Sequence, residues 1–285
     1  MGKALTDQQV AEFGRTGVIS PLPGIGAGAA AALRRQLEGL EQAEGGRLSK
    51  KTNHKPHLLL RSLADLIRDP RILDPVEDLL GPDLFCWATS FFIKNPQDRA
   101  RVTWHQDSTY WGLSSPDVVT AWVAFSPSTV ASGCMRVIPG SHLTDQLPHR
   151  ETYAADNLLS RGQEVDVAVD ERQALDVVLE PGQMSIHHVR LIHGSEPNRG
   201  ADRRIGFAIR YVPTHVRQLS GLRDYATLVR GRDAFGHFLH EPAPAADFDP
   251  TAVAFHAQAM EDQMKILYAG AKKLPEGIAG SDRPA

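Results

Sequence analysis

Two histidines and an aspartate stand out in this sequence as a candidate metal site. His105 and Asp107 are separated by a single residue in the segment Trp104-His105-Gln106-Asp107. Alternate side chains of an extended strand share a face, so we expect this imidazole and this carboxylate to lie side by side. His193, on another strand-like segment, adds a second imidazole. Two histidines and one carboxylate form a set that holds Fe(II) and leaves positions open for O2 and a co-substrate.

The choice of His193 over its neighbours depends on the residues that come after it in the chain. His187 and His188 lie near the end of a predicted strand, where an imidazole can be a core residue or a partner of a metal ligand. His193 precedes a glycine and a serine and lies a short distance before Arg204. We therefore predict His193 as the third ligand, with His187 and His188 as the alternatives.

Arg204 is suited to bind a carboxylate in the same pocket. Over residues 204–211, large apolar side chains alternate with a second set that includes Arg204 and Arg210. Arg203 is in phase with the apolar set, so we expect it at the mouth of the strand. A buried guanidinium needs an anionic partner, and its planar fork matches a carboxylate. Arg204 is predicted to bind an anionic ligand, with a structural salt bridge as the alternative; Arg210 is a candidate for substrate binding or for pairing with a carboxylate.

Four further residues are weaker candidates for this pocket. Trp122 lies on the less apolar face of its predicted strand, and Ser195 offers a hydroxyl near the co-substrate; core packing and turn formation are the alternative roles. Tyr110 and Trp111 follow the His/Asp pair and supply the aromatic area that an enclosed site requires. We expect substrate contacts at these two aromatics and in the segment 143–172, which is long enough to form a lid.

These residues are positioned by short strand-like segments that alternate with glycine and proline turns. Many short strands separated by such turns indicate an antiparallel sandwich or barrel. We predict strands over Leu84–Lys94 (with Lys94 reaching water at its end), Val118–Phe125, Met135–Ile138, Ala174–Leu179, Met184–His187 and Ile205–Val212.

Helices are predicted on both sides of this β-rich part. The first follows Thr6-Asp7-Gln8-Gln9, which has the spacing of a capping box, and ends by Gly17. Residues 45–57 are expected to form a surface loop. The other predicted helices are Ala27–Glu44, two short helices within Ser62–Leu80 broken at Pro70 and Pro75, and a last helix with Val253, Met260, Met264 and Leu267 on one face.

Size and composition fit one domain of 285 residues, with a helical part over about 1–80, a β core over about 84–213 and a helical part over about 214–285. A net charge of -3 gives no reason to expect nucleic acid or an anionic membrane as a partner. The only two cysteines, Cys86 and Cys134, lie in apolar segments, which favours buried thiols in a reducing compartment. With no apolar N-terminal segment or long apolar stretch, we expect a cytoplasmic protein.

Several of these segments together resemble the phytanoyl-CoA dioxygenase family of Fe(II)- and 2-oxoglutarate-dependent oxygenases, and the resemblance extends over most of the chain. It is most specific in Trp104-His105-Gln106-Asp107, in residues 133–142, and in His193-Gly194-Ser195 leading to Arg204. The resemblance implies a mainly β fold with flanking helices around a double-stranded β-helix core (a cupin-like jelly roll). It also implies roles for individual residues: His105, Asp107 and His193 as iron ligands, Arg204 as the clamp on the distal carboxylate of 2-oxoglutarate, and Trp122 and Ser195 as further contacts of that co-substrate.

The same resemblance implies hydroxylation of a small, polar metabolite, such as an aminophosphonate- or amino-acid-like compound, with release of succinate and CO2. Asp107 favours hydroxylation, because related halogenases have a small residue at this position so that chloride can bind iron. A cupin-like metal-binding isomerase or sensor without oxygenase activity is the alternative. Such a protein would keep the three metal ligands but would not need Arg204.

Overall fold

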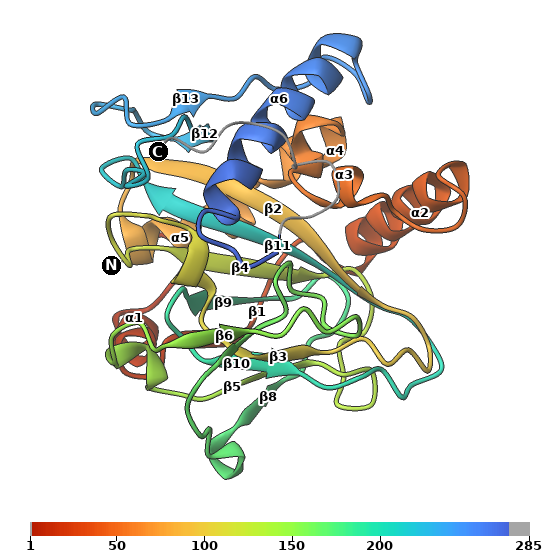
Figure 1. Ribbon diagram of the computed structural model, residues 1–285, viewed down its shortest axis with the longest axis vertical. Helices are drawn as coiled ribbons and strands as arrows, with labels where there is room; N and C mark the ends of the chain where they lie inside the picture. The colour runs from red at the N-terminus through yellow and green to blue at the C-terminus, as the bar shows by residue number, and fades with distance from the viewer. Residues whose placement is uncertain (1, 274–285) are drawn as a thin grey trace.

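Two mainly antiparallel sheets stack on each other at the centre of the computed structural model, which describes residues 2–273 (Figure 1). The larger sheet has the strand order β1-β9-β4-β11-β2-β12-β13 and the smaller one the order β3-β10-β5-β8, while β6 and β7 form a separate hairpin. The strands are β1 (Val18–Leu22), β2 (Leu84–Lys94), β3 (Val102–His105), β4 (Val119–Ala124), β5 (Met135–Val137), β6 (His149–Glu151), β7 (Gln163–Val165), β8 (Leu175–Val177), β9 (Met184–His188), β10 (His193–Ser195), β11 (Arg204–Pro213), β12 (Tyr225–Arg230) and β13 (Leu239–His240).

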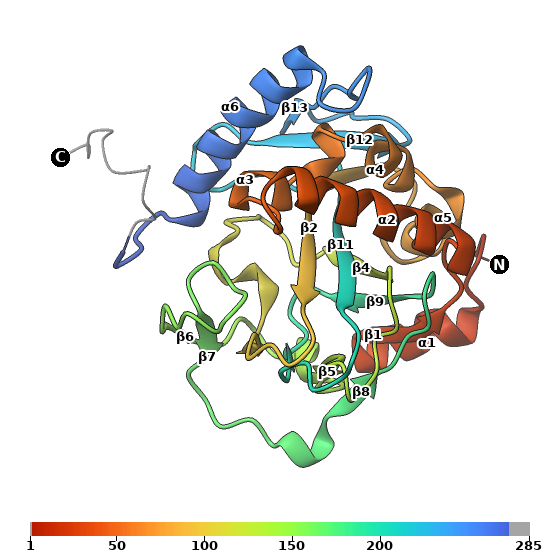
Figure 2. The ribbon, with the colours of Figure 1, turned by 90° about the vertical axis from the view of Figure 1, so that its right-hand side faces the viewer.

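Helices cover the outer face of the larger sheet. Figure 2 shows α2, α4 and α5 together on one side of β2 and β11. The helices are α1 (Asp7–Thr16), α2 (Ala27–Ala43), α3 (Lys50–Asn53), α4 (Arg61–Leu66), α5 (Pro70–Leu80) and α6 (Pro250–Leu267). No helix within residues 2–273 is long and apolar enough to cross a membrane.

The alternation along β11 decides which side chains face the site. Ile205, Phe207 and Ile209 are fully buried in the core between the larger sheet and the helices. Ala208 belongs to a second core cluster, between the two sheets, together with Trp122 of β4. Because side chains alternate across a strand, Arg204 and Arg210 share the inner face with Ala208. The predicted phase of this strand is thus confirmed, as is the predicted jelly-roll core with flanking helices.

The first helix begins and ends where the local sequence signals predicted. Thr6 caps α1 through a complete capping box with Gln9, and Gly17 ends the helix with a φ of 77°, a conformation that favours glycine. Both cysteines are buried free thiols, as expected for the described chain.

Two predictions about the N-terminal helical part were wrong. Pro75 does not break α5, because Ile72, Leu73 and Val76 anchor one side of this helix in the core and offset the lost backbone hydrogen bond. Residues 45–57 are not all loop, since they contain α3 and a 3₁₀ turn, Pro56–Leu58.

The last helix, α6, forms as predicted, but its buried face is not simply the apolar face expected from the sequence. Val253, expected on that face, is 40% exposed, whereas His256 is buried and hydrogen-bonds through Nε2 to the carbonyl of His54 at 2.8 Å. Gln263 is buried on the same side. Because polar residues take part in this contact, apolar periodicity alone did not reveal it.

Candidate active site

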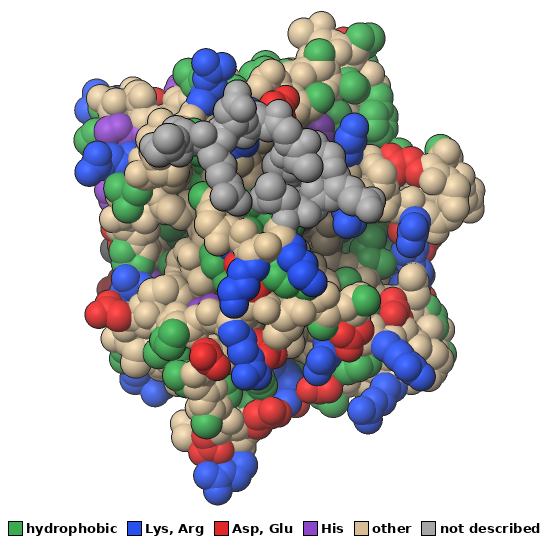
Figure 3. Space-filling model, in the orientation of Figure 1, with side chains coloured by type: hydrophobic (Ala, Val, Ile, Leu, Met, Phe, Trp, Pro, Cys, Tyr) green, Lys and Arg blue, Asp and Glu red, His purple; other side chains and the backbone are tan. Residues whose placement is uncertain are grey.

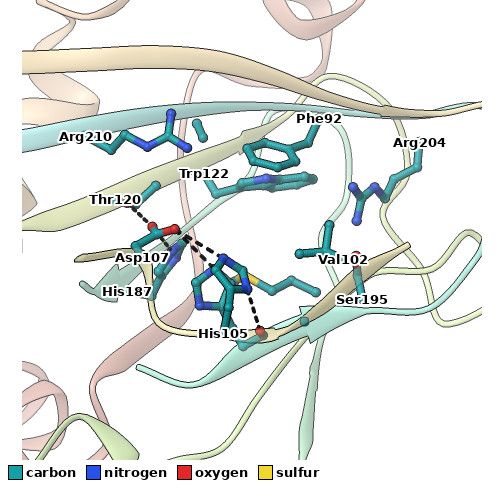
Figure 4. Close-up of a pocket in the computed structure, with 14 residues that line it drawn as sticks. Phe92, Val102, His105, Asp107, Thr120, Trp122, His187, Ser195, Arg204 and Arg210 are labelled. Carbon is teal, nitrogen blue, oxygen red and sulfur yellow. Dashed lines mark hydrogen bonds and ion pairs between the residues drawn. The ribbon is translucent and has the colours of Figure 1, made fainter. Parts of the chain in front are cut away.

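His105, Asp107 and His193 meet in a pocket between the two sheets. Figure 4 shows the first two side chains facing each other in this pocket. His105 ends β3 and pairs directly with His193 at the start of β10, with ring centroids 4.1 Å apart. One ligand atom from each of the three residues lies within 4.8 Å of the others. The structure therefore brings together the three residues that the sequence singled out as metal ligands.

Asp107 reaches this cluster in a different way from the one predicted. The strand ends at His105, and Asp107 begins a 3₁₀ turn in which its backbone N–H donates to the carbonyl of Val189 at 3.0 Å. Its carboxylate turns back so that Oδ1 lies 3.3 Å from Nε2 of His105 and 3.9 Å from Nε2 of His193. The expected alternation along one strand was wrong, but the two side chains still meet.

Backbone carbonyls orient both imidazoles. Nδ1 of His105 lies 2.9 Å from the carbonyl of Thr103 and 3.0 Å from that of His193, and Nδ1 of His193 lies 2.9 Å from the carbonyl of Leu191. A carbonyl can only accept, so each Nδ1 carries the proton and donates it. Each Nε2 is then left as a lone pair aimed at the cluster, which is how metal-binding histidines are usually held.

The protonation states of the cluster suit a cation. Burial alone would raise the pKa of Asp107, but the proximity of His105, His187 and His193 holds it well below its usual range. Burial, followed by the proximity of His105, lowers the pKa of His193 well below its usual range. A charged carboxylate beside a neutral imidazole is the form that binds a metal ion.

His187 lies in the same pocket but lacks the hydrogen bonds of the other two histidines. It is 2% exposed, and its Nε2 is 3.9 Å from Oδ2 of Asp107, which is too long for a hydrogen bond. Neither ring nitrogen has a hydrogen-bond partner in the described chain. His188, the other alternative, is hydrogen-bonded through Nδ1 to the backbone N–H of Arg190 and does not line the pocket.

Arg204 lies at the other end of the pocket from Asp107. It is 2% exposed and donates through Nη1 to the carbonyl of Gly133 at 2.7 Å, while its Nε has no partner. Its guanidinium carbon lies 5.4 Å from the ring centroid of Trp122, and burial lowers the pKa of Arg204 to about 10. Within residues 2–273 no carboxylate forms an ion pair with it, so the structural salt bridge considered as the alternative is not present.

Lys94 and Ser195 lie beside this arginine. Lys94 pairs with Arg204 across β2 and β11 and is fully buried, so the expectation that it reaches water was wrong. Its Nζ donates to the hydroxyl of Ser195 at 2.7 Å. Burial, together with the charge of Arg204, lowers the pKa of Lys94 to about 6.

The three residues predicted to contact substrate are placed differently from one another. Arg210 lines the pocket, whereas Tyr110 and Trp111 do not. Tyr110 stacks on Arg161, whose guanidinium carbon is 3.9 Å from the ring centroid. Trp111 is buried against Trp87, at 4.9 Å between ring centroids.

Two further residues that were not predicted from the sequence, Thr120 and Phe92, also line the pocket. Thr120 shares its strand face with Trp122, and this alternation was visible in the sequence.

The segment 143–172, predicted as a long loop and lid, contains the hairpin of β6 and β7. It packs on the edge of the smaller sheet, where the hydroxyl of Thr103 donates to the carbonyl of Gln163 at 2.6 Å. Figure 3 shows basic and acidic side chains interspersed over the lower half of this face of the molecule. At residue 171, this segment also forms an ion pair, between Arg136 and Glu171 at 2.9 Å.

Comparisons with known proteins identify the family of this chain. A family model described as phytanoyl-CoA dioxygenase matches residues 25–206. Among curated proteins, a probable alpha-ketoglutarate-dependent hypophosphite dioxygenase from Stutzerimonas stutzeri is 30% identical over 62% of this chain and 63% of its own length. Peroxisomal phytanoyl-CoA dioxygenase from Homo sapiens is 29% identical over 46% of this chain and 40% of its own length. The chain thus spans less than two thirds of these relatives.

Solved structures extend the similarity over nearly the whole chain. The apo form of ThoJ, a non-heme monooxygenase, is 35% identical with a TM-score of 0.82 and covers 91% of this chain and 97% of its own. CytC3 with Fe(II) and alpha-ketoglutarate is 28% identical with a TM-score of 0.62 and covers 87% of this chain and 98% of its own. The family and the cofactor pair predicted from the sequence are confirmed. This chain belongs to the phytanoyl-CoA dioxygenase family of Fe(II)- and 2-oxoglutarate-dependent oxygenases.

Proposed function

We propose that this protein is an Fe(II)- and 2-oxoglutarate-dependent dioxygenase that hydroxylates a small, polar metabolite and releases succinate and CO2. The observation that carries the proposal is the meeting of His105, Asp107 and His193 in one pocket with an unpaired, buried Arg204. The three donors fit Fe(II), because two neutral imidazoles and one carboxylate on one side leave coordination positions free. Arg204 fits the distal carboxylate of 2-oxoglutarate, since a buried guanidinium without an ion pair requires an anion.

When bound, Fe(II) supplies the redox chemistry that couples decarboxylation of 2-oxoglutarate by O2 to hydroxylation of the substrate. The chain's own residues orient and enclose the reactants. The carbonyls of Thr103 and Leu191 keep each ligand imidazole in the tautomer whose Nε2 is free. Trp122, whose ring lies beside Arg204, and Ser195, which is held by Lys94, line the co-substrate end of the pocket. Phe92 and Met135 keep the space between the sheets apolar.

Two features support hydroxylation of a small, polar compound. Asp107 occupies the position at which a halide would need a small residue, so chlorination is not expected. Two similar curated proteins are named for small, polar compounds, hypophosphite and L-proline. The proposed substrate contact on this chain is Arg210, while substrate contacts at Tyr110 and Trp111 and a cytoplasmic location stay predictions.

Anaerobic titration of the Fe(II)-loaded protein with 2-oxoglutarate tests the proposal. A chelated keto acid gives a charge-transfer band, and the unaltered protein should show it. In Arg204→Ala, loss of charge-assisted hydrogen bonds worth roughly 2–5 kcal/mol in a buried site should weaken 2-oxoglutarate binding about 30-fold or more. Arg204→Lys should recover only part of this, because an ammonium group lacks the planar fork.

Fe(II) affinity should stay nearly unchanged in both variants, since Arg204 is not a proposed ligand. Unchanged 2-oxoglutarate affinity in Arg204→Ala would remove this arginine from the site. Absence of the band from the unaltered protein would instead favour a cupin-like metal protein without oxygenase activity.

A further inference from the structure

Three polar side chains form a row across the inner face of the larger sheet, at the end of the pocket away from Arg204. On β9 and β4, His187 pairs with Thr120, and on β4 and β11, Thr120 pairs with Arg210. All three side chains line the same pocket. Figure 4 shows them on the Asp107 side of Trp122, with Arg204 on its other side.

Arg210 has hydrogen-bonding capacity that the described chain does not use. It is 9% exposed, and Nη1 donates to the hydroxyl of Ser90 at 2.7 Å, while Nε has no partner. Burial lowers the pKa of Arg210, and the charge of Asp107, with which it forms no ion pair within the described residues, offsets this only partly. A buried guanidinium in this position needs an anionic partner.

The other two members of the row point to the same kind of ligand. His187 is 2% exposed and neither ring nitrogen has a partner, so one N–H of the ring is free to donate. The hydroxyl of Thr120 donates only a long bond of 3.4 Å to Oδ2 of Asp107. A hydroxyl, an imidazole N–H and a guanidinium on adjacent strands are three donors that line the same part of the pocket.

The charges of the loaded site leave Arg210 without a counter-ion. The two charges of Fe(II) exceed the single charge of Asp107, and the two carboxylates of 2-oxoglutarate neutralise that excess together with Arg204. Arg204 and Arg210 are six residues apart on one extended strand, about 20 Å of backbone, so the anion held by Arg204 is not the partner of Arg210. The positive charge of Arg210 is therefore left for the substrate.

We infer that the row of His187, Thr120 and Arg210 binds an anionic group of the substrate, which makes the substrate an oxyanion: a carboxylate, phosphate, phosphonate or phosphinate. This inference rests on the proposed function and adds the substrate class to it. The row touches Asp107, whose Oδ2 is 3.4 Å from the hydroxyl of Thr120 and 3.9 Å from Nε2 of His187. An anion placed there is repelled by Asp107 until the metal ion neutralises that carboxylate, so anion binding should depend on metal.

Anaerobic calorimetric titration tests the inference with defined probes. Hypophosphite, methylphosphonate and acetate are titrated into the protein loaded with Fe(II) and 2-oxoglutarate, and dimethyl methylphosphonate serves as the neutral analogue of the second probe. We expect at least one anion to bind, the neutral analogue to bind at least about tenfold more weakly, and anion affinity to fall when the metal is omitted.

Variants of the row residues test whether the anion binds at the row. Arg210→Met should weaken the anion about tenfold or more, Arg210→Lys should weaken it less, and both should keep the charge-transfer band of the Fe(II)–2-oxoglutarate complex. Thr120→Val, which preserves side-chain shape, should also weaken the anion and provides the test if Arg210→Met does not fold. Arg15→Met is the matched control, because it removes the same charge from an exposed position on α1.

Three results would overturn the inference: no anion binds to the loaded protein, the neutral analogue binds as well as the anions, or the anion binds equally well to the row variants that fold. Loss of the band in Arg210→Met without a change in anion affinity would assign Arg210 to support of Asp107 instead. If the unaltered protein does not give the band with Fe(II) and 2-oxoglutarate, the proposed function itself is wrong. The band therefore distinguishes failure of the proposed function from failure of anion binding.

Discussion

Among single residues, hydrogen bonding separates the two histidines that lie beside Asp107. Nδ1 of His193 donates to the carbonyl of Leu191, which aims Nε2 into the cluster. His187 lies at the same distance from the carboxylate, 3.9 Å, but no hydrogen bond orients its ring. The difference supports our proposal that His193 binds the metal and that His187 donates to another ligand.

Replacing each histidine in turn tests this assignment. His193→Ala should weaken Fe(II) binding more than about 100-fold, since even the loss of a group that only supports a ligand costs 10- to 100-fold. His187→Phe should change Fe(II) affinity less than about tenfold, which is less than the loss of a group that supports a metal ligand would cost. Anaerobic competition with a coloured chelator measures both, with circular dichroism as the control for folding. Equal loss of iron in the two variants would contradict the distinction.

Within the larger sheet, the contact between β4 and β11 shapes the pocket through a glycine. Gly206 lies on the inner face of β11, and the ring of Trp122 packs directly on its backbone. A Cβ at this position would lie 1.7 Å from the ring of Trp122. Only glycine lets the indole lie flat on the strand and line the pocket beside Arg204.

Gly206→Ala should therefore displace Trp122 and disturb the co-substrate end of the pocket. We expect a loss of stability of about 1–3 kcal/mol, as for other overpacked sites, and weaker 2-oxoglutarate binding in the anaerobic titration. Gly39→Ala, in the interior of α2 with no atom near the added Cβ, is the matched control and should stabilise the protein by about 0.5–1 kcal/mol. The prediction is wrong if both variants bind 2-oxoglutarate like the unaltered protein.

For the whole molecule, buried contacts join the parts before and after the jelly roll. Lys55 and Glu241 form an ion pair at 2.5 Å in which neither side chain is exposed, and His57 lies 3.2 Å from the same carboxylate. Removing one partner of such a pair leaves an uncompensated buried charge. These contacts support our proposal that the chain folds as a single domain.

Partly buried histidines should make this domain sensitive to acid. Burial, with the charge of Arg210, lowers the pKa of His54 to about 4, and burial, with the proximity of His142, lowers the pKa of His188 to about 4. The unfolded chain binds these protons near pH 6.5, so stability is complete above that pH and falls as the pH drops toward 4. Each histidine contributes up to about 1.4 kcal/mol per pH unit in that window.

Urea unfolding of the metal-free protein between pH 7.5 and 4.5 measures this effect. The unfolding free energy should decrease with acid in a single transition, and His54→Gln should reduce the slope. The matched control is the exposed His237, whose replacement by Gln should leave the slope unchanged. An unfolding free energy that stays constant over this range would contradict the prediction.

The sequence by itself determined the features that depend on near neighbours. The capping box at Thr6 defined the start of α1, and the alternation along residues 204–211 placed Arg204 and Arg210 on one face. The residue types at 105, 107 and 193 indicated a metal site and, through their spacing, the family. Such signals are local, because capping and alternation are decided by residues a few positions apart.

Only the tertiary structure decided what depends on packing between distant segments. Pairing of β3 with β10 set His193 against His105, while Asp107 left the strand and reached the same point from a turn. The row that ends at Arg210 exists only through the register of three strands that are remote in sequence. The burial of Lys94 likewise depends on the distant segments that pack over its side chain. Register and burial are properties of pairs of segments, and a pattern within one segment does not contain them.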